Sequence, residues 1–534
     1  MSNDIVLING NILTMWPMRP RATAVAIRNG RIVEVGNDDD CRTAAGSAAG
    51  IIDLRGRTAA PGLNDAHAHP MGVGLALSDL DIANPPCRSI ADIVELIRTK
   101  TASLPPGQWI VAHGYDQGRL RDQRHPTRHD LDAVSPEHPV LLIRSCYHIG
   151  VANSAALSAA GIDRRTSNPA GGTIDRDDLG DPTGVLREHA FGLVQRTIGE
   201  PTEDQIAEAL VLGGNAFLAA GVTSAVEAEV RRPEVLRAYQ RLRSENRLPI
   251  RSCLMMIIED TLDEMIDLGI RTGFGDERLR IGPAKLFSDG SIGGRTARMR
   301  RPYEGSNDSF GLWMQEPRVM KDRIKQAHKA GFQVGVHAIG DAAVDLVLDA
   351  YEEASSEFPR ANTRHRIEHC SIVDEQTIER IARLGVIPVP GTSFLYYFKD
   401  SYVQNLGLAR LRYAYGMATF QKHGVIAAAS SDAPVVPVNA LIGLQTMMTR
   451  RDLQGDRVWP EESIGLHDAL RAYTVNGAYA TFEESFKGML SPGMAGDVAV
   501  FETDLEAVSP DQIGSVRIDH TILDGSLVFT RVGA

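Results

Sequence analysis

Hydrophobic and polar positions divide the chain into two β-rich ends and a long centre in which strand-like and helix-like segments alternate. At the N-terminal end, Asn29-Gly30 lies between two β-rich runs, which is typical of a tight hairpin. The C-terminal end repeats this style around Asp524-Gly525. The predicted strands are residues 5–12, 23–28, 31–35 and 51–55 at one end and residues 497–502, 516–523 and 527–532 at the other. The pattern predicts one small β-sandwich that both ends of the chain build together.

The centre alternates short apolar runs with longer amphipathic segments, which is the pattern of βα units around a parallel sheet. The candidate strands are residues 58–65, 222–228, 250–256, 281–287, 333–337, 365–369, 386–389 and 425–430. Their number is the one that a closed (β/α)8 barrel requires. Apolar residues at helical spacing predict helices over residues 318–330 and 341–355. The predicted fold class is α/β, with a TIM-type barrel.

The interval between residues 65 and 222 is far longer than an ordinary βα connection. It contains strand-like runs of its own, so we interpret it as an insertion subdomain after the first barrel strand. That loop belongs to the face on which barrel enzymes hold their active sites, and we expect the insertion to lie over the site. The expected domains are residues 1–58 and 491–534 for the sandwich, 59–84 and 198–490 for the barrel, and 85–197 for the insertion.

Composition narrows the class of protein. With 43% hydrophobic and 23% charged residues, the 534-residue chain has the composition of an ordinary globular protein. A net charge of −12 argues against binding to nucleic acid or to an anionic membrane. The five cysteines form no CxxC pair, and no leader peptide or bilayer-spanning run is visible. We therefore expect a cytoplasmic protein that acts on a small molecule. The sequence contains no GxGxxG fingerprint, no P-loop and no G-x-S-x-G elbow. Their absence argues against a nucleotide-binding protein and against a serine hydrolase.

Side chains that can bind a metal follow five of the predicted strands. They are His67 and His69 after the first, Lys285 in the fourth, His337 in the fifth, His369 in the sixth and Asp432 after the eighth. Residues i and i+2 of a strand point the same way, so His67 and His69 can face one ion. Imidazole and carboxylate groups are ligands that Zn²⁺ prefers. The ordered set predicts a divalent-metal centre at the mouth of the barrel.

Lysine is rare in a buried strand because desolvation makes its ammonium costly. Lys285 is therefore interpreted either as a neutral amine that takes up carbon dioxide as a carbamate or as the partner of a carboxylate such as Asp289. Asp432 is interpreted as a general acid and base, the alternative being a helix N-cap.

Four further residues are candidates for substrate binding. Asp289 and Arg295 follow Lys285 and are expected to line the mouth, with a structural salt bridge as the alternative for Arg295. His148 and Asn153 lie in the insertion, where they either reach the substrate or stabilise a loop by hydrogen bonds.

The order HxH, Lys, His, His, Asp resembles the metal site of the amidohydrolase superfamily. Residues 285–297 (KLFSDGSIGGRTA), 336–341 (VHAIGD) and 148–157 (HIGVANSAAL) are similar to the branch that contains the YtcJ-type hydrolases and N-substituted formamide deformylase, amidohydrolase family 3. The closing run at residues 488–497 (GMLSPGMAGD) extends the resemblance to almost the whole chain. The resemblance implies one or two divalent ions, usually zinc, hydrolysis of C–N bonds, and in some relatives a carboxylated lysine at the position of Lys285.

The expected function is hydrolysis of a linear or N-substituted amide, such as a formamide, N-acyl amine, carbamate or urea, by metal-activated water. Asp432 is expected to accept the proton of that water and to deliver it to the leaving nitrogen. A cyclic amide or imide hydrolase, or an isomerase or lyase, on the same scaffold is one alternative. A non-catalytic structural relative is another, although such a protein should have lost ligands. We expect a homodimer, and we expect specificity to depend on the insertion and on the loop at residues 391–398.

Overall fold

The computed structural model of the chain describes residues 4–82, 87–102, 104–115, 117–118, 120–144, 149–169, 172–259 and 261–533. The chain divides into two compact units, one made of Met1–Val73 with Ile206–Ala534 and the other of Gly74–Gln205. The first unit holds the barrel and the sandwich.

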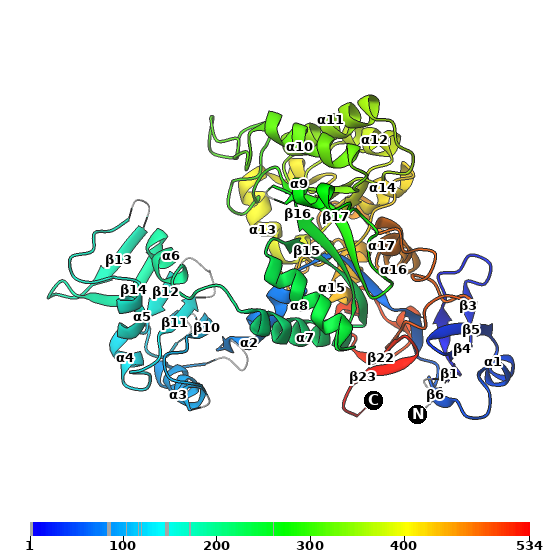
Figure 1. Cartoon of the computed structure of the whole chain (residues 1–534), viewed down its shortest axis with the longest axis horizontal. Coiled ribbons are helices and arrows are strands. Elements are labelled where there is room, and N and C mark those ends of the chain that lie inside the picture. Colours follow the sequence, from blue (N-terminus) through cyan, green and yellow to red (C-terminus); the bar gives the residue numbers. More distant parts are fainter. Residues whose placement is uncertain are drawn as a thin grey trace. The chain divides into compact units, whose positions relative to one another are not determined.

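A parallel sheet of seven strands forms the barrel, in the order β8-β15-β16-β17-β18-β19-β20 (Figure 1). These strands are β8 Leu63–Ala68, β15 Val222–Val230, β16 Arg251–Ile257, β17 Leu279–Phe287, β18 Val334–Ala338, β19 Arg366–His369 and β20 Ile387–Val389. Every residue of β8, β16, β19 and β20 is buried, as expected where helices cover the outside of a barrel and side chains fill its inside. The predicted fold class is confirmed.

The eighth predicted strand, residues 425–430, closes the barrel without forming a regular ladder. On one side, the amides of Ala428 and Ser430 donate to the carbonyls of Pro388 and Pro390 at 3.0 and 3.2 Å. On the other, Ala429 accepts from the amide of Ala66 at 3.1 Å. Pro388 and Pro390 have no N–H to donate in return. One isolated bridge therefore forms, between Gly391 and Ser430, where the amide of Thr392 donates to the carbonyl of Ser430 at 3.1 Å. The missing reciprocal bonds explain why this segment is extended but not paired as a strand.

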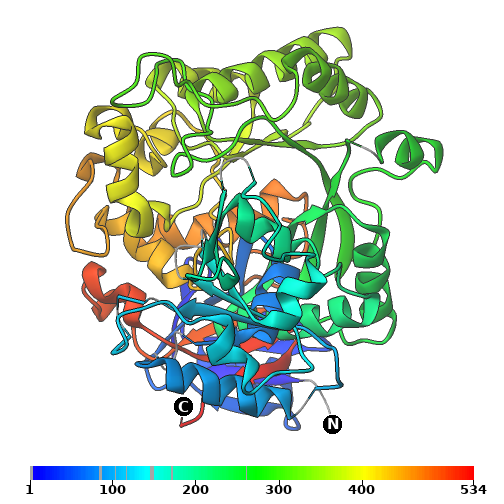
Figure 2. The same cartoon turned by 90° about the vertical axis from the view of Figure 1, so that its left-hand side faces the viewer.

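Helices lie outside the strands, as the green and yellow ribbons of Figure 2 show. They are α7 Glu203–Ala219, α8 Pro233–Ser244, α9 Leu262–Asp267, α10 Pro317–Lys329, α11 Asp341–Glu357, α12 Glu375–Leu384, α13 Phe394–Leu406, α14 Met417–Lys422, α15 Ala440–Thr449, α16 Leu466–Ala472 and α17 Val475–Ala480. The helices predicted over residues 318–330 and 341–355 are confirmed as α10 and α11. Within the described part of the chain, no helix has the length and apolarity needed to cross a membrane.

The sandwich consists of two sheets, β5-β4-β1-β6 and β23-β22-β21-β7-β2-β3, and takes strands from both ends of the chain as predicted. Its strands are β1 Ile5–Ile8, β2 Asn11–Leu13, β3 Arg21–Ala22, β4 Ala24–Arg28, β5 Arg31–Gly36, β6 Gly50–Asp53, β7 Thr58–Pro61, β21 Val498–Phe501, β22 Ile518–Leu523 and β23 Ser526–Thr530, with helix α1 Asp38–Ala45 beside them. One core contains Leu7 and Ile27 from the first end with Val498 and Val500 from the second.

The predicted strand over residues 58–65 is two strands, β7 of the sandwich and β8 of the barrel. Gly62 lies between them, and a Cβ atom at this position would lie 2.1 Å from the hydroxyl of Thr223. Glycine therefore lets the chain pass from one domain to the other against β15.

The second unit begins within α2 Pro70–Ser78 and contains a mixed sheet in the order β13-β14-β12-β11-β10-β9. Its elements are β9 Leu80–Asp81, α3 Ile90–Thr101, β10 Ile110–Tyr115, α4 Arg128–Asp132, β11 Val140–Arg144, β12 Ile149–Ala152, α5 Ser154–Ala159, β13 Gly172–Arg176, β14 Pro182–Glu188 and α6 His189–Gln195. Two hydrophobic clusters on the sheet give the unit cores of its own.

Candidate metal centre

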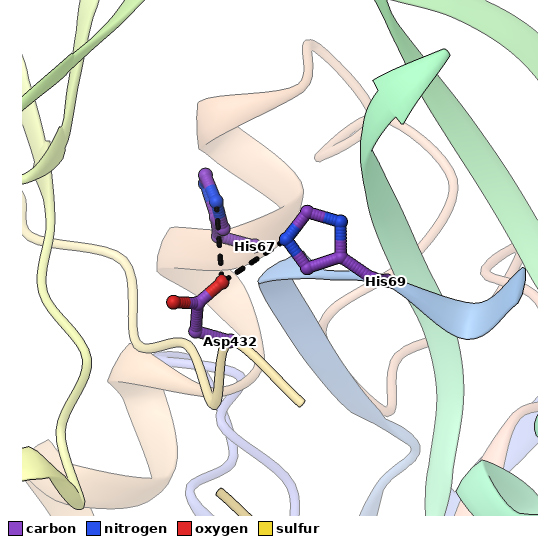
Figure 3. A group of neighbouring side chains, drawn as sticks. All are labelled: His67, His69 and Asp432. Carbon is purple, nitrogen blue, oxygen red and sulfur yellow. Dashed lines mark ion pairs between the residues drawn. The ribbon is translucent and has the colours of Figure 1, made fainter. Parts of the chain in front are cut away.

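His67, His69 and Asp432 converge at the carboxyl end of β8 (Figure 3). Nε2 of His69 lies 3.2 Å from Oδ1 of Asp432, and Nε2 of His67 lies 3.5 Å from the same oxygen. The closing segment brings Asp432 into place, because the amide of Asp432 donates to the carbonyl of His67 at 2.8 Å. No helix begins at Asp432, so the N-cap alternative does not apply.

His369, the last residue of β19, joins this group. Its ring centroid lies 4.8 Å from that of His67 and 4.6 Å from that of His337. Nδ1 of His369 lies 4.0 Å from the Asp432 carboxylate, is buried, and has no hydrogen-bond partner among the residues that the structure describes. A buried polar atom without a partner is costly, which indicates a position built for a ligand that completes it.

His337 presents one nitrogen to the same region. Its Nε2 lies 3.1 Å from the carbonyl of Gly290, and because a carbonyl only accepts, Nε2 carries the proton. Nδ1 is then left with a free lone pair, which is the form that binds a metal.

Lys285 lies in β17 with an exposed fraction of 1%. Its Nζ lies 4.8 Å from the ring of Phe287, and no hydrogen bond or ion pair joins it to any residue in the described ranges. Burial lowers the pKa of this amine to about 8, against the opposing charges of Glu368 and Asp432. The carboxylate-partner alternative is therefore wrong for Lys285.

Three of the four imidazoles have the protonation that a metal requires. Burial lowers the pKa of His67 and His369 well below the usual value, and it lowers that of His337 to about 4, so all three are neutral at pH 7. Burial also acts on His69, but the carboxylates of Asp432 and Glu227 raise its pKa overall. Neutral imidazoles beside one carboxylate and an unpaired lysine fit a divalent ion such as Zn²⁺.

Asp289 is tied into the backbone at the mouth of the barrel. It accepts the amides of Arg298, Ile339 and Gly340 at 2.7, 3.0 and 2.8 Å, and its exposed fraction is 1%. These bonds show that Asp289 fixes the loop, and its expected substrate contact stays a prediction.

Asn153 is also structural. It caps α5, its Oδ1 accepts the amides of Val140 and Ala156, and its Nδ2 donates to the carbonyls of Ser135 and His138. Because the side chain is fully buried, the loop-stabilising alternative holds.

Arg295 is exposed, donates to the carbonyl of Glu304 at 2.6 Å and lies over the ring of Tyr303 at 5.3 Å. Neither contact is the structural salt bridge that was the alternative to substrate binding. His148 lies outside the described residues.

Two buried glutamates beside the histidines were not among the residues predicted for the site. Glu368 forms a hydrogen bond with Nδ1 of His67, and Oε1 of Glu227 lies 3.7 Å from Nδ1 of His69. A signal was present, since a charged residue inside a strand that is buried along its length needs a partner.

Comparisons with known proteins show what the chain is similar to. The amidohydrolase family matches residues 50–529. YtcJ of Bacillus subtilis is 30% identical over 533 residues, covering 98% of each chain, and N-substituted formamide deformylase of Arthrobacter pascens is 30% identical over 549 residues, covering 99% of each. The crystal structure of an uncharacterized metal-dependent hydrolase from Pyrococcus furiosus superposes with a TM-score of 0.78 at 29% identity, over 95% of this chain and 100% of that one.

Proposed function

The chain belongs to the amidohydrolase family, whose members hydrolyse carbon–nitrogen bonds other than peptide bonds, and we propose that it cleaves a linear or N-substituted amide at a divalent-metal centre. The observation that carries this proposal is the convergence of His67, His69 and Asp432 next to the unpartnered Nδ1 of His369. Formamides, N-acyl amines, carbamates and ureas are the substrate classes that we propose.

Six side chains would hold one or two ions, with zinc as the expected metal: His67, His69, Lys285, His337, His369 and Asp432. Such an ion, when bound, supplies a Lewis acid that activates water and polarises the carbonyl group. Lys285 contributes through its unpaired amine. In its neutral form the amine forms an N–C bond with carbon dioxide and releases a proton, which converts the side chain into a carboxylate-bearing carbamate.

Asp432 carries the proton transfers. Its carboxylate accepts a proton from the attacking water and delivers it to the leaving nitrogen as the C–N bond breaks. Protonation is essential because an amide anion is a very poor leaving group. Phe394 stacks on His369 at 6.1 Å and keeps one side of the site apolar, which strengthens the electrostatic interactions of Asp432.

The relative from Arthrobacter pascens points to N-substituted formamides as the first compounds to test. We also propose that a homodimer is the working form. The experiment combines elemental analysis of the purified protein with a panel of N-formyl, N-acyl, carbamate, urea and lactam compounds. We expect bound metal and hydrolysis of an acyclic member, with loss of activity in chelator and recovery on adding Zn²⁺. Hydrolysis confined to lactams or cyclic imides would contradict the proposal, and so would full activity without metal.

A further inference from the structure

The two histidines at the end of β8, His67 within it and His69 just after it, use their ring nitrogens in the same way. Each directs Nε2 to Oδ1 of Asp432, at 3.5 Å for His67 and 3.2 Å for His69. Each directs Nδ1 to a different buried glutamate, Glu368 behind His67 and Glu227 behind His69. The two glutamates are not in the set of six ligands named above, and they lie on the far side of the rings from Asp432.

We propose that Glu368 and Glu227 are positioning residues that hold His67 and His69 with Nδ1 protonated and Nε2 free for the metal. This inference rests on the proposed metal centre. A carboxylate can only accept at Nδ1, so it selects the tautomer in which Nε2 has the lone pair. It also fixes the plane of the ring and makes the coordinating nitrogen more basic.

Glu368 is itself held in one orientation. The guanidinium of Arg366, two residues away on β19, donates to its two oxygens at 2.8 and 2.7 Å, and both side chains are fully buried. Arg366 also donates to the carbonyl of Ala66 in β8 at 2.6 Å. These bonds fix the orientation of the Glu368 carboxylate and tie β19 to the strand that carries His67.

Glu227 is anchored by one oxygen only. Its Oε2 accepts the amide of Met71 at 3.0 Å and the hydroxyl of Tyr239 at 2.9 Å. Its Oε1 is buried and has no hydrogen-bond partner in the described ranges. The distance of 3.7 Å from Oε1 to Nδ1 of His69 exceeds that of a hydrogen bond, and a shift of about 0.5 Å would close it. Oε1 of Glu227 is therefore available to accept a hydrogen bond from Nδ1 of a metal-bound His69.

The test measures metal binding in Glu368→Gln and Glu227→Gln, variants that keep the size of the side chain and remove its charge. Zinc affinity is obtained by competition with a chromogenic chelator, and the absorption spectrum of the cobalt-substituted protein reports the arrangement of the ligands. We expect each variant to bind zinc about 10–100-fold more weakly than the wild type. Tyr239→Phe, which removes one anchor of Glu227, should weaken binding less and shift the cobalt spectrum in the same direction as Glu227→Gln.

Glu462→Gln is the matched control. Glu462 is a buried carboxylate that pairs with Arg412 at 2.5 Å and accepts the amide of Thr419 at 2.9 Å, and it contacts none of the histidines. It should lower stability without changing zinc affinity. Wild-type affinity and spectrum in folded Glu227→Gln and Glu368→Gln would overturn the inference, as would equal weakening in Glu462→Gln. If Glu368→Gln does not fold because Arg366 loses its partner, Glu227→Gln and Tyr239→Phe still decide the case. Absence of metal from the wild type would instead overturn the proposed function.

Discussion

His328 and His365 share a hydrogen bond of 2.8 Å between Nδ1 of the first and Nε2 of the second. The amide of Val334 donates to Nδ1 of His365 at 3.0 Å, so that ring carries its proton on Nε2 and donates to His328. His328 in turn has its proton on Nε2, which lies 2.7 Å from the carbonyl of Phe358. Every polar atom of the buried pair is satisfied only while both rings are neutral.

We predict that the protein loses stability as the pH falls below about 6.5. Burial lowers the pKa of both rings in the folded chain, and the charge of Arg360 acts in the same direction. Between the folded and unfolded pKa values the unfolded chain binds more protons, so the free energy of unfolding falls with falling pH by about 1.4 kcal/mol per pH unit for each ring. Urea unfolding at several pH values measures this slope.

His328→Gln isolates the contribution of one ring. The variant should be less stable than the wild type at pH 8, and its free energy of unfolding should depend less steeply on pH below about 6.5. A slope equal to that of the wild type would show that the pair is not the source of the acid sensitivity.

We predict that Asp432→Asn keeps the metal but almost abolishes turnover. Asparagine retains an oxygen near His67 and His69 but cannot exchange a proton at neutral pH. Because general acid–base catalysis contributes about 10²–10⁴ in rate, kcat should fall by that factor. Elemental analysis compares the metal content of the variant with that of the wild type, and steady-state kinetics on the best substrate of the panel compares their kcat values. Normal turnover in this variant would remove Asp432 from the proton transfers.

Lys285 is predicted to carry a carbamate in the metal-loaded protein. ¹³C NMR of protein prepared in ¹³C-bicarbonate should show one carbamate signal, which disappears in Lys285→Met together with much of the metal. Lys487→Met is the control, since this buried lysine already pairs with Glu483 at 2.8 Å. An unmodified Lys285 in an active, metal-loaded protein would contradict this prediction and would mean that the amine itself is the functional group.

The sequence predicts the barrel and the six candidate ligands because both depend on local pattern. Strand runs are apolar, and the metal-binding types His, Lys and Asp stand at strand ends in an order that only a barrel brings together. Two features of the fold could not be predicted from the sequence. Pro388 and Pro390 remove the donors that would make residues 425–430 a regular strand, and Gly62 divides residues 58–65 between two sheets. Neither effect is visible without knowing which neighbour each residue faces.

Partners of the ligands are harder to predict than the ligands. Glu227 and Glu368 do not belong to a sequence motif. Their contacts with His69 and His67 depend on how side chains of different strands point inside the barrel. Asn153 and Asp289 show a second difficulty. Both are polar residues near expected functional segments, yet each side chain accepts hydrogen bonds from backbone amides. Residue type alone does not separate these cases, because the same side chains satisfy buried backbone groups or bind ligands.

The last prediction concerns the junction between the barrel and the sandwich. Arg251 begins β16 and donates to both oxygens of Asp497, which precedes β21, at 2.7 and 3.0 Å. The arginine is 1% exposed, so Arg251→Met leaves Asp497 buried and unpaired, and the free energy of unfolding should fall by about 3–5 kcal/mol. Arg383→Met, which removes an exposed ion pair with Glu352, should change it by less than about 1 kcal/mol. Urea unfolding compares the two variants. A double variant, Arg251→Met with Asp497→Leu, should recover much of the loss because it removes both charges, and failure to recover would mean that the arginine acts through packing instead.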